Sequence, residues 1–142
     1  MATYVKYEPF IERLANKEID FFGTTETYKA VIHTDAPVVA TDDDLADLTQ
    51  ISGSNGYTTG GENITFNSTR TGATVTATAV DVVWTASGGN LGNSTTSRYV
   101  SYYNDTHASD ALVAYWDYGS TFTVASGETF TLDFGASLAT LA

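Results

Sequence analysis

The chain has 142 residues, the length of a single domain with one hydrophobic core. Six basic and seventeen acidic residues give a formal net charge of -11, which would repel a nucleic acid backbone, so nucleic acid is not expected as a partner. The sequence has no cysteine, which excludes disulfides, thiolate zinc sites and thiol nucleophiles.

The first residues lack the basic-then-apolar pattern of a secretion signal, and no apolar run approaches the roughly 20 residues that span a bilayer. We therefore expect a soluble protein that is made in the cytoplasm and has no membrane partner. Twenty-four threonines and nine tyrosines, with charged residues at 16%, favour strands and turns over solvent-exposed helices. The composition predicts a mainly β fold.

The N-terminal part of the chain contains the one clear helix signal, over residues 8–18. Pro9 suits the first turn of a helix, and Phe10, Ile11 and Leu14 fall on one face, which we expect to dock on the rest of the protein. We predict an N-terminal arm and short helix over 1–25, followed by a β body over 26–142, within one domain overall.

Next comes a strand over 26–33, and then a short helical turn that begins at Thr41 and Asp42 and ends near Asp47 or Thr49. Residues 52–61 are predicted to form a loop, because Asn55-Gly56 is a strong turn signal.

The remainder of the chain reads as short strands separated by turn residues. The predicted strands are 62–69, 73–86, 97–104, 111–118, 120–125 and 128–134. This spacing predicts a single antiparallel β-sandwich, jelly-roll-like, with the short N-terminal helix beside it.

Alternation of apolar and polar residues assigns faces in three of these strands. The sets expected to share a face are Val80, Val82 and Trp84; Leu112, Ala114 and Trp116; and Phe130, Leu132 and Phe134, the last alternating with Thr129, Thr131 and Asp133.

Two oxygen-rich segments could hold a cation, since Ca²⁺ prefers several carboxylate oxygens. One is the cluster of Asp42, Asp43, Asp44 and Asp47, and the other is the loop over 104–110. Helix capping explains the first and an ordinary hairpin turn explains the second, so no metal and no cofactor are expected.

The sequence gives little support for a catalytic site. The two histidines, His33 and His107, are not accompanied by a nucleophile elbow that would single out one serine. A pair of carboxylates for glycoside cleavage could come from Asp81, Asp117 and Asp133, although a carboxylate on the wet face of a strand needs no function. We therefore expect no enzyme activity and assign no catalytic residues.

Aromatic residues crowd two neighbouring strands that we expect to pair: Tyr99, Tyr102, Tyr103, Tyr115, Trp116 and Tyr118. Three interpretations stay open, which are core packing, a protein interface, and a platform for stacking sugars.

Several stretches over nearly the whole chain carry a family resemblance. They are the amphipathic opening helix and residues 27–32, 36–37, 44–51, 55–61, 82–89, 102–105 and 114–120. In these the chain resembles small structural proteins of tailed bacteriophages, found among capsid decoration (cement) and head-fibre-type proteins. The resemblance implies a non-enzymatic protein on the capsid surface of the virion, made in the host cytoplasm, with the major capsid protein as its partner.

A decoration protein would bind the outside of the shell and stabilise it by bridging major capsid protein subunits, as a dimer or trimer that matches the symmetry of the shell. High acidity would keep it soluble and away from the genome. The expected shell or oligomer interface is the apolar N-terminal segment with Tyr4, Tyr7, Phe10, Phe21 and Phe22.

Two other functions remain open at this point. One is a phage fibre or tail module that binds a host-surface glycan through the Tyr/Trp-rich sheet. The other is a small carbohydrate-active enzyme that would use Asp117 or Asp133.

Overall fold

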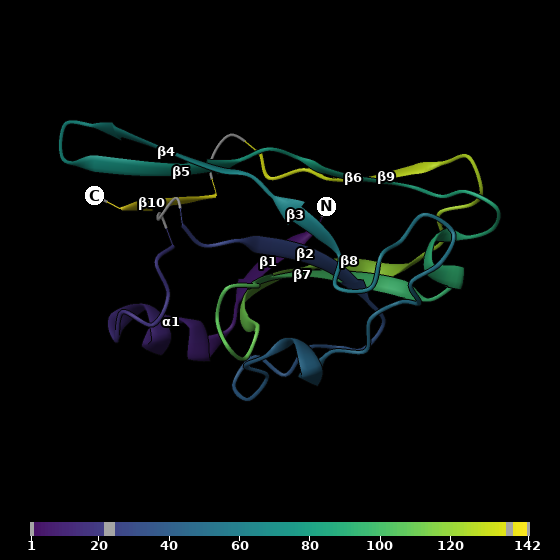
Figure 1. Ribbon diagram of the computed structural model, residues 1–142, viewed down its shortest axis with the longest axis horizontal. Coiled ribbons are helices and arrows are strands. Elements are labelled where there is room, and N and C mark those ends of the chain that lie inside the picture. The colour runs from purple at the N-terminus through teal and green to yellow at the C-terminus, as the bar shows by residue number, and fades with distance from the viewer. Residues whose placement is uncertain (1, 22–24, 136–137, 142) are drawn as a thin grey trace.

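The structure is a computed structural model that describes residues 2–21, 25–135 and 138–141. Two layers of antiparallel strands face each other across the core, and helix α1 (Glu8–Ala15) lies on the outer side of the lower layer (Figure 1). The expectation of a mainly β fold with antiparallel sheets and a short N-terminal helix is confirmed. The jelly-roll connectivity stays a prediction.

The lower layer is one five-stranded sheet. From edge to edge, its strands are β1 (Thr3–Lys6), β8 (Ala111–Phe122), β7 (Ser97–Asn104), β2 (Tyr28–His33) and β3 (Glu62–Ile64). All neighbours are antiparallel. The aromatic-rich strands β7 and β8 pair with each other, as expected.

The upper layer consists of a three-stranded and a two-stranded sheet placed end to end (Figure 1). The first has the order β10 (Ala139–Leu141), β5 (Thr74–Ala79) and β4 (Phe66–Thr71), and the second pairs β6 (Val82–Thr85) with β9 (Thr129–Leu132). Strands β4 and β5 form a hairpin closed by Gly72 and Ala73. Its first turn residue, Gly72, has φ 61°, which suits a type II′ turn.

Two 3₁₀ turns, η1 (Leu45–Asp47) and η2 (Leu91–Asn93), complete the set of described helical elements. Helix α1 begins at Glu8 with Pro9 in its first turn, as predicted, but ends at Ala15. Only Phe10 of its expected docking face is buried, whereas Ile11 is 48% exposed and Leu14 36%. None of the described helices is long and apolar enough to span a membrane.

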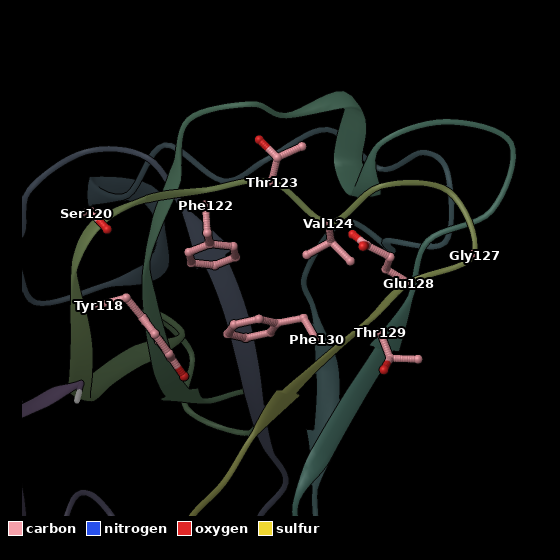
Figure 2. Close-up of a pocket in the computed structure, with 9 residues that line it drawn as sticks. All are labelled: Tyr118, Ser120, Phe122, Thr123, Val124, Gly127, Glu128, Thr129 and Phe130. Carbon is pink, nitrogen blue, oxygen red and sulfur yellow. The ribbon is translucent and has the colours of Figure 1, made fainter.

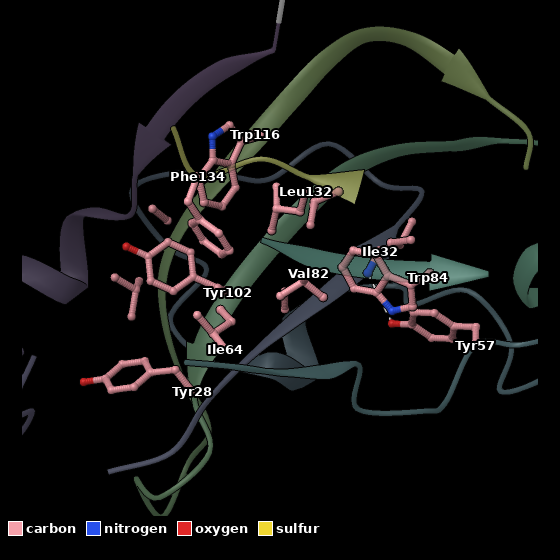
Figure 3. Close-up of a cluster of buried hydrophobic side chains, with 14 of the residues drawn as sticks. Tyr28, Ile32, Tyr57, Ile64, Val82, Trp84, Tyr102, Trp116, Leu132 and Phe134 are labelled. Atoms are coloured by element: carbon pink, nitrogen blue, oxygen red, sulfur yellow. Dashed lines mark hydrogen bonds between the residues drawn. The ribbon is translucent and has the colours of Figure 1, made fainter. Parts of the chain in front are cut away.

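The main core fills the space between the two layers (Figure 3). Tyr102 and Trp116 of the lower layer and Trp84 and Leu132 of the upper layer all belong to this core, and all four are buried. A smaller apolar cluster lies on the other face of the five-stranded sheet, where Tyr7 packs with Leu48 and Leu112. The five-stranded sheet is therefore covered on both faces.

Three predicted strands have different limits in the structure. The strand over 73–86 divides into β5 and β6 at Val80 and Asp81, and the strand over 62–69 divides into β3 and β4 at Thr65. Conversely, 111–118 and part of 120–125 form the single strand β8, which runs through Gly119. The expected grouping of Val80 with Val82 and Trp84 is wrong, since Val80 is 56% exposed.

A β-bulge at Val113 changes the faces of β8. Tyr102 is paired with Ala114 and Tyr103 with Leu112, so Val113 is an extra residue in the ladder. As a result, Leu112 packs in the smaller cluster, whereas Ala114 and Trp116 pack in the main core. The expectation that these three share a face is wrong, because a bulge shifts the alternation by one residue.

The predicted N-terminal arm is part of the sheet. Residues 3–6 are strand β1, the edge strand that pairs with β8, and the Tyr7 N–H donates a 3.1 Å hydrogen bond to the Val113 carbonyl oxygen. Neither β1 nor the C-terminal β10 was expected from the sequence. Only the sheet partner reveals them, because each is short and carries no strong pattern.

Candidate functional site

The residues predicted to contact a shell mostly hold this chain together. Tyr7, Phe10 and Phe21 are at most 8% exposed, and Phe22 lies outside the described residues. Tyr4, on β1, is 37% exposed; its hydroxyl oxygen lies 3.1 Å from that of Tyr102. Among the described residues of this predicted set, therefore, only Tyr4 has a side chain on the surface.

Four polar side chains form a hydrogen-bonded network on the face of the five-stranded sheet that bears the smaller cluster. His33 Nε2 lies 2.9 Å from Ser101 Oγ, and the Tyr7 hydroxyl oxygen lies 2.9 Å from the same Oγ. On the other side of the imidazole, Nδ1 lies 3.2 Å from a carboxylate oxygen of Asp35. The ring of Tyr99 stacks on His33, with 5.5 Å between centroids.

Serine, histidine and aspartate are also the residue types of a hydrolytic triad. Here His33, Ser101 and Tyr7 are each 0% exposed, so a substrate carbonyl cannot reach Ser101 Oγ in this fold. Burial lowers the pKa of His33, an effect that the Asp35 carboxylate opposes. These hydrogen bonds therefore link β2, β7 and Tyr7, the residue after β1, inside the protein. No local signal could have found it, because positions 33 and 101 are 68 residues apart.

The aromatic residues of β7 and β8 lie mainly inside the protein. Tyr102 and Tyr103 are at most 1% exposed, Tyr99 is 7% and Trp116 is 8%. Trp84 is 1% exposed. Trp84 is therefore closed to a sugar ring, and Trp116 exposes only an edge to an open pocket that it lines with Thr131 and Phe134.

One aromatic group does reach the surface, at the end of β8. Tyr118, Phe122 and Phe130 line an open groove of about 690 Å³, with Ser120 and Glu128 at its rim (Figure 2). The rings of Phe122 and Phe130 stack with 4.7 Å between centroids, and Tyr118 packs edge-on to both. Burial raises the pKa of Tyr118 to about 12. The predicted break at Gly119 concealed that Tyr118 and Phe122 lie on one strand.

The three candidate carboxylates are occupied in local hydrogen bonds. Arg98 binds both oxygens of Asp117, at 2.8 and 3.0 Å. This hydrogen bonding, together with the Gly119 N–H, lowers the pKa of Asp117, which does not suit a general acid. Asp81 accepts from the Phe134 N–H at 3.1 Å, and Asp133 from that of Gly135 at 2.7 Å.

The acidic cluster is explained by capping, although the cap is not where we expected it. The cap of η1 is Asp44, whose side chain accepts from the Ala46 N–H at 2.9 Å, while Asp47 accepts from the N–H of Asp43 at 2.9 Å. Asp43 also forms an ion pair with Arg13 of α1 at 3.1 Å. Carboxylate oxygens of Asp43, Asp44 and Asp47 lie within 4.8 Å of one another, but backbone donors and an arginine already satisfy them.

The loop over 104–110 is likewise an ordinary turn. Asn104 Oδ1 accepts from the N–H groups of Thr106 and His107, at 2.9 and 3.1 Å. His107 Nδ1 lies 3.0 Å from Ser109 Oγ, and Asp105 forms an ion pair with Lys29 at 3.0 Å.

The outer face of the upper layer consists almost wholly of threonine. Directly paired residues in antiparallel strands share a face. Since Ala77, Val82 and Leu132 pack in the core, the residues that alternate with them point outward. We call this surface the threonine face; its members are Asn67, Thr69, Thr71, Thr74, Thr76, Thr78, Val83, Thr85, Thr129 and Thr131.

Charge is distributed very unevenly over the molecule. Ten of the seventeen carboxylates lie between Glu8 and Asp47. That segment includes α1 and η1, which lie beyond the five-stranded sheet, on the opposite side from the upper layer (Figure 1). The threonine face has no charged member, and Asp81 and Asp133 lie at the junction of its two halves.

Comparison of the chain with protein-family models, with curated proteins and with solved structures gives no match in any of the three.

Proposed function

We propose that this chain is a virion structural protein of a tailed bacteriophage without enzyme activity. In this role it is a capsid decoration protein, which binds the outside of the shell through its threonine face and bridges major capsid protein subunits. The observation that carries the proposal is the contrast between a broad threonine face, whose neighbouring carboxylates are Asp81 and Asp133 at the junction of its two halves, and an acidic opposite side. The resemblance of the sequence to phage structural proteins supports the same assignment.

Physical chemistry favours the threonine face as the docking surface. Charged residues are depleted from the centre of protein interfaces, because a charge that loses its water must be paired. A threonine on a strand presents a methyl group and a hydroxyl, and neither has the desolvation cost of an unpaired charge. The acidic side would then face solvent, where it keeps the unassembled protein soluble.

The first test is the number of copies of the chain per particle, measured by quantitative mass spectrometry on particles of the phage that encodes it. A ratio to the major capsid protein near one, or a simple fraction of one, is the expected result. A handful of copies per particle would indicate a fibre or tail position, and absence from particles would overturn the virion assignment.

A second test locates the docking surface. The protein should raise the temperature at which undecorated shells open, because a ligand stabilises the state that it binds. Thr131→Glu, on the threonine face, should weaken shell binding about tenfold or more, since it would bury an unpaired charge. Thr41→Glu, an exposed substitution on the acidic side, should bind like the wild type. Equal binding by all three proteins would exclude this face.

The groove of Tyr118, Phe122 and Phe130 favours a second candidate function, a fibre or tail module that binds a host-surface glycan. Half-buried aromatic rings beside hydroxyl and carboxylate groups are typical of sugar sites. The ring centroids of Phe130 and Trp84 are 5.9 Å apart, so an oligosaccharide bound in the groove should change the fluorescence of Trp84. Phe122→Ala should abolish that change and Val83→Ala should not. A glycan array without any binder would contradict this candidate.

A further inference from the structure

Strand β4 is a long sheet edge whose one charged side chain, that of Arg70, donates a 2.7 Å hydrogen bond to the Gly72 carbonyl oxygen at the turn. Of the six strands that end a sheet in the described structure, β4 has six residues, whereas β1, β3, β6, β9 and β10 have three or four. All of its residues after Phe66 are exposed. Natural edges are usually shortened or guarded by proline, lysine or inward-pointing charges, because an open ladder recruits another strand.

The free hydrogen-bonding groups of β4 can be identified from the register. Thr71 and Thr74 close the two-residue turn, so the odd-numbered residues of β4 bond to β5. The Val80 N–H bonds to the Thr65 carbonyl oxygen at 3.0 Å, which agrees with this pattern. The N–H and C=O groups of Phe66, Ser68 and Arg70 therefore point away from β5.

The charge pattern suits a second copy of this same chain. Between Asn63 and Val80 the sequence has no carboxylate and one charged residue, Arg70, in a chain of net charge -11. Contact through the segment between Glu8 and Asp47, by contrast, would bring ten carboxylates of each copy together. The β4–β5 hairpin also lies at one end of the upper layer, away from β6 and β9, where another molecule can approach it (Figure 1).

We propose that two copies of the chain associate by antiparallel pairing of β4 with β4 about a two-fold axis at Ser68. The pairing sets Ser68 opposite Ser68, and Arg70 opposite Phe66 of the second copy, with about six backbone hydrogen bonds. The two arginines are then four residues apart along the ladder, roughly 13 Å, which exceeds the screening length of about 10 Å at 0.1 M salt. The dimer joins two threonine faces into one. It does not depend on the proposed function.

Sedimentation analysis over a wide concentration range tests the association. Wild type should approach twice the chain mass of 15.1 kDa as concentration rises. Ser68→Pro removes an outward N–H while leaving every bond between β4 and β5, so it should stay monomeric at concentrations where wild type dimerises. Thermal unfolding of this variant checks that the hairpin is intact. A wild type that remains monomeric overturns the proposal.

Cross-linking tests the position of the axis, because the chain has no cysteine of its own. Directly opposite residues at a hydrogen-bonded pair are about 5.5 Å apart between Cα atoms, within the range of a disulfide. Ser68→Cys should oxidise rapidly to a covalent dimer. Thr85→Cys, also at an exposed position but on β6, should do so much more slowly. Equal rates would contradict pairing at β4.

Discussion

Gly61 lies where the 52–61 loop passes close to strand β2. Its φ is 78°, and a Cβ built on it would overlap the carbonyl oxygen of Ala30. Gly119 has nearly the same φ, 79°, but has nothing within 4 Å of such a Cβ. A substitution at Gly119 should therefore show the cost of a side chain in the left-handed region alone, whereas one at Gly61 adds the cost of a steric clash.

We expect Gly119→Ala to lower the free energy of unfolding by about 1 kcal/mol, the cost of a side chain in the left-handed region. Gly61→Ala should lower it by about 3–5 kcal/mol, since the backbone must also shift away from Ala30. Urea denaturation of both variants measures the difference. Equal losses would mean that β2 and the loop are not in close contact.

The buried imidazole of His33 couples stability to pH. Burial lowers its pKa in the folded protein below the ordinary value of 6.5. As pH falls below 6.5, the unfolded chain therefore takes up a proton that the folded protein refuses, and the free energy of unfolding decreases. The contribution of His33 to the free energy of unfolding is constant above the pKa that His33 has in the unfolded chain. It is lost progressively as pH falls below that value.

We expect His33→Gln to be less stable than wild type above pH 6.5, because its hydrogen bonds with Ser101 and Asp35 are disturbed. Its stability should nevertheless depend less on pH below 6.5 than that of wild type, as chemical denaturation at several pH values can measure. If the free energy of unfolding of His33→Gln depends on pH below 6.5 as strongly as that of wild type, His33 is not the source of this dependence.

At the scale of secondary structure elements, β8 illustrates why alternation patterns fail locally. Its sequence alternates well enough to predict a strand, but the bulge at Val113 moves Leu112 to the opposite face from Ala114. Gly119 looks like a turn residue, yet β8 continues through it with φ 79°. Pairing with β7 resumes beyond Gly119, since Asp117 lies opposite Tyr99 and Phe122 opposite Ser97.

Strand β1 shows the same dependence on a partner, and it leads to a prediction. Deletion of residues 1–7 should cost about 3 kcal/mol or more, because it removes the edge strand and the buried Tyr7 with its bond to Ser101. Deletion of residues 1–2 alone should have a small effect on the melting temperature measured by circular dichroism. If the longer deletion is equally mild, β1 does not stabilise the sheet. If the deletion of residues 1–7 does destabilise the protein, weaker shell binding by that variant would not demonstrate a direct contact between these residues and the shell.

At the scale of the whole molecule, the core is unusually rich in tyrosine. Burial raises the pKa of Tyr7, Tyr28, Tyr57, Tyr102 and Tyr103 above the ordinary value of 10.0. Above pH 10.0 the unfolded chain releases phenolic protons that the folded protein retains, so the free energy of unfolding falls as pH rises.

We therefore expect alkaline unfolding in one cooperative step that begins above pH 10.0. The absorbance of tyrosinate from the buried rings should appear together with the loss of near-ultraviolet circular dichroism, whereas N-acetyltyrosine amide titrates near 10. Tyrosinate absorbance that develops fully before the dichroism signal changes would show that these rings are accessible to solvent.

The sequence by itself determined the features that depend on near neighbours. Composition specified the mainly β class, Pro9 marked the start of α1, Asn55-Gly56 marked a loop, and residues 97–104 match β7 at both ends. The alternation of Phe130, Leu132 and Phe134 also placed these residues correctly on one face, where Leu132 and Phe134 are buried and Phe130 is partly buried. Such signals are local because turn geometry and side-chain period depend on only a few consecutive residues.

Only the tertiary structure decided which apolar residues are available to a partner. Tyr7 and Phe21 looked like anchors for another protein, yet contacts with residues far along the chain bury them, as Tyr7 and Ser101, 94 positions apart, illustrate. The threonine face, the open edge of β4 and the Tyr118 groove likewise arise from the way strands are paired. Burial and exposure are properties of strand pairing, and the order and register of the strands are not written in any local pattern.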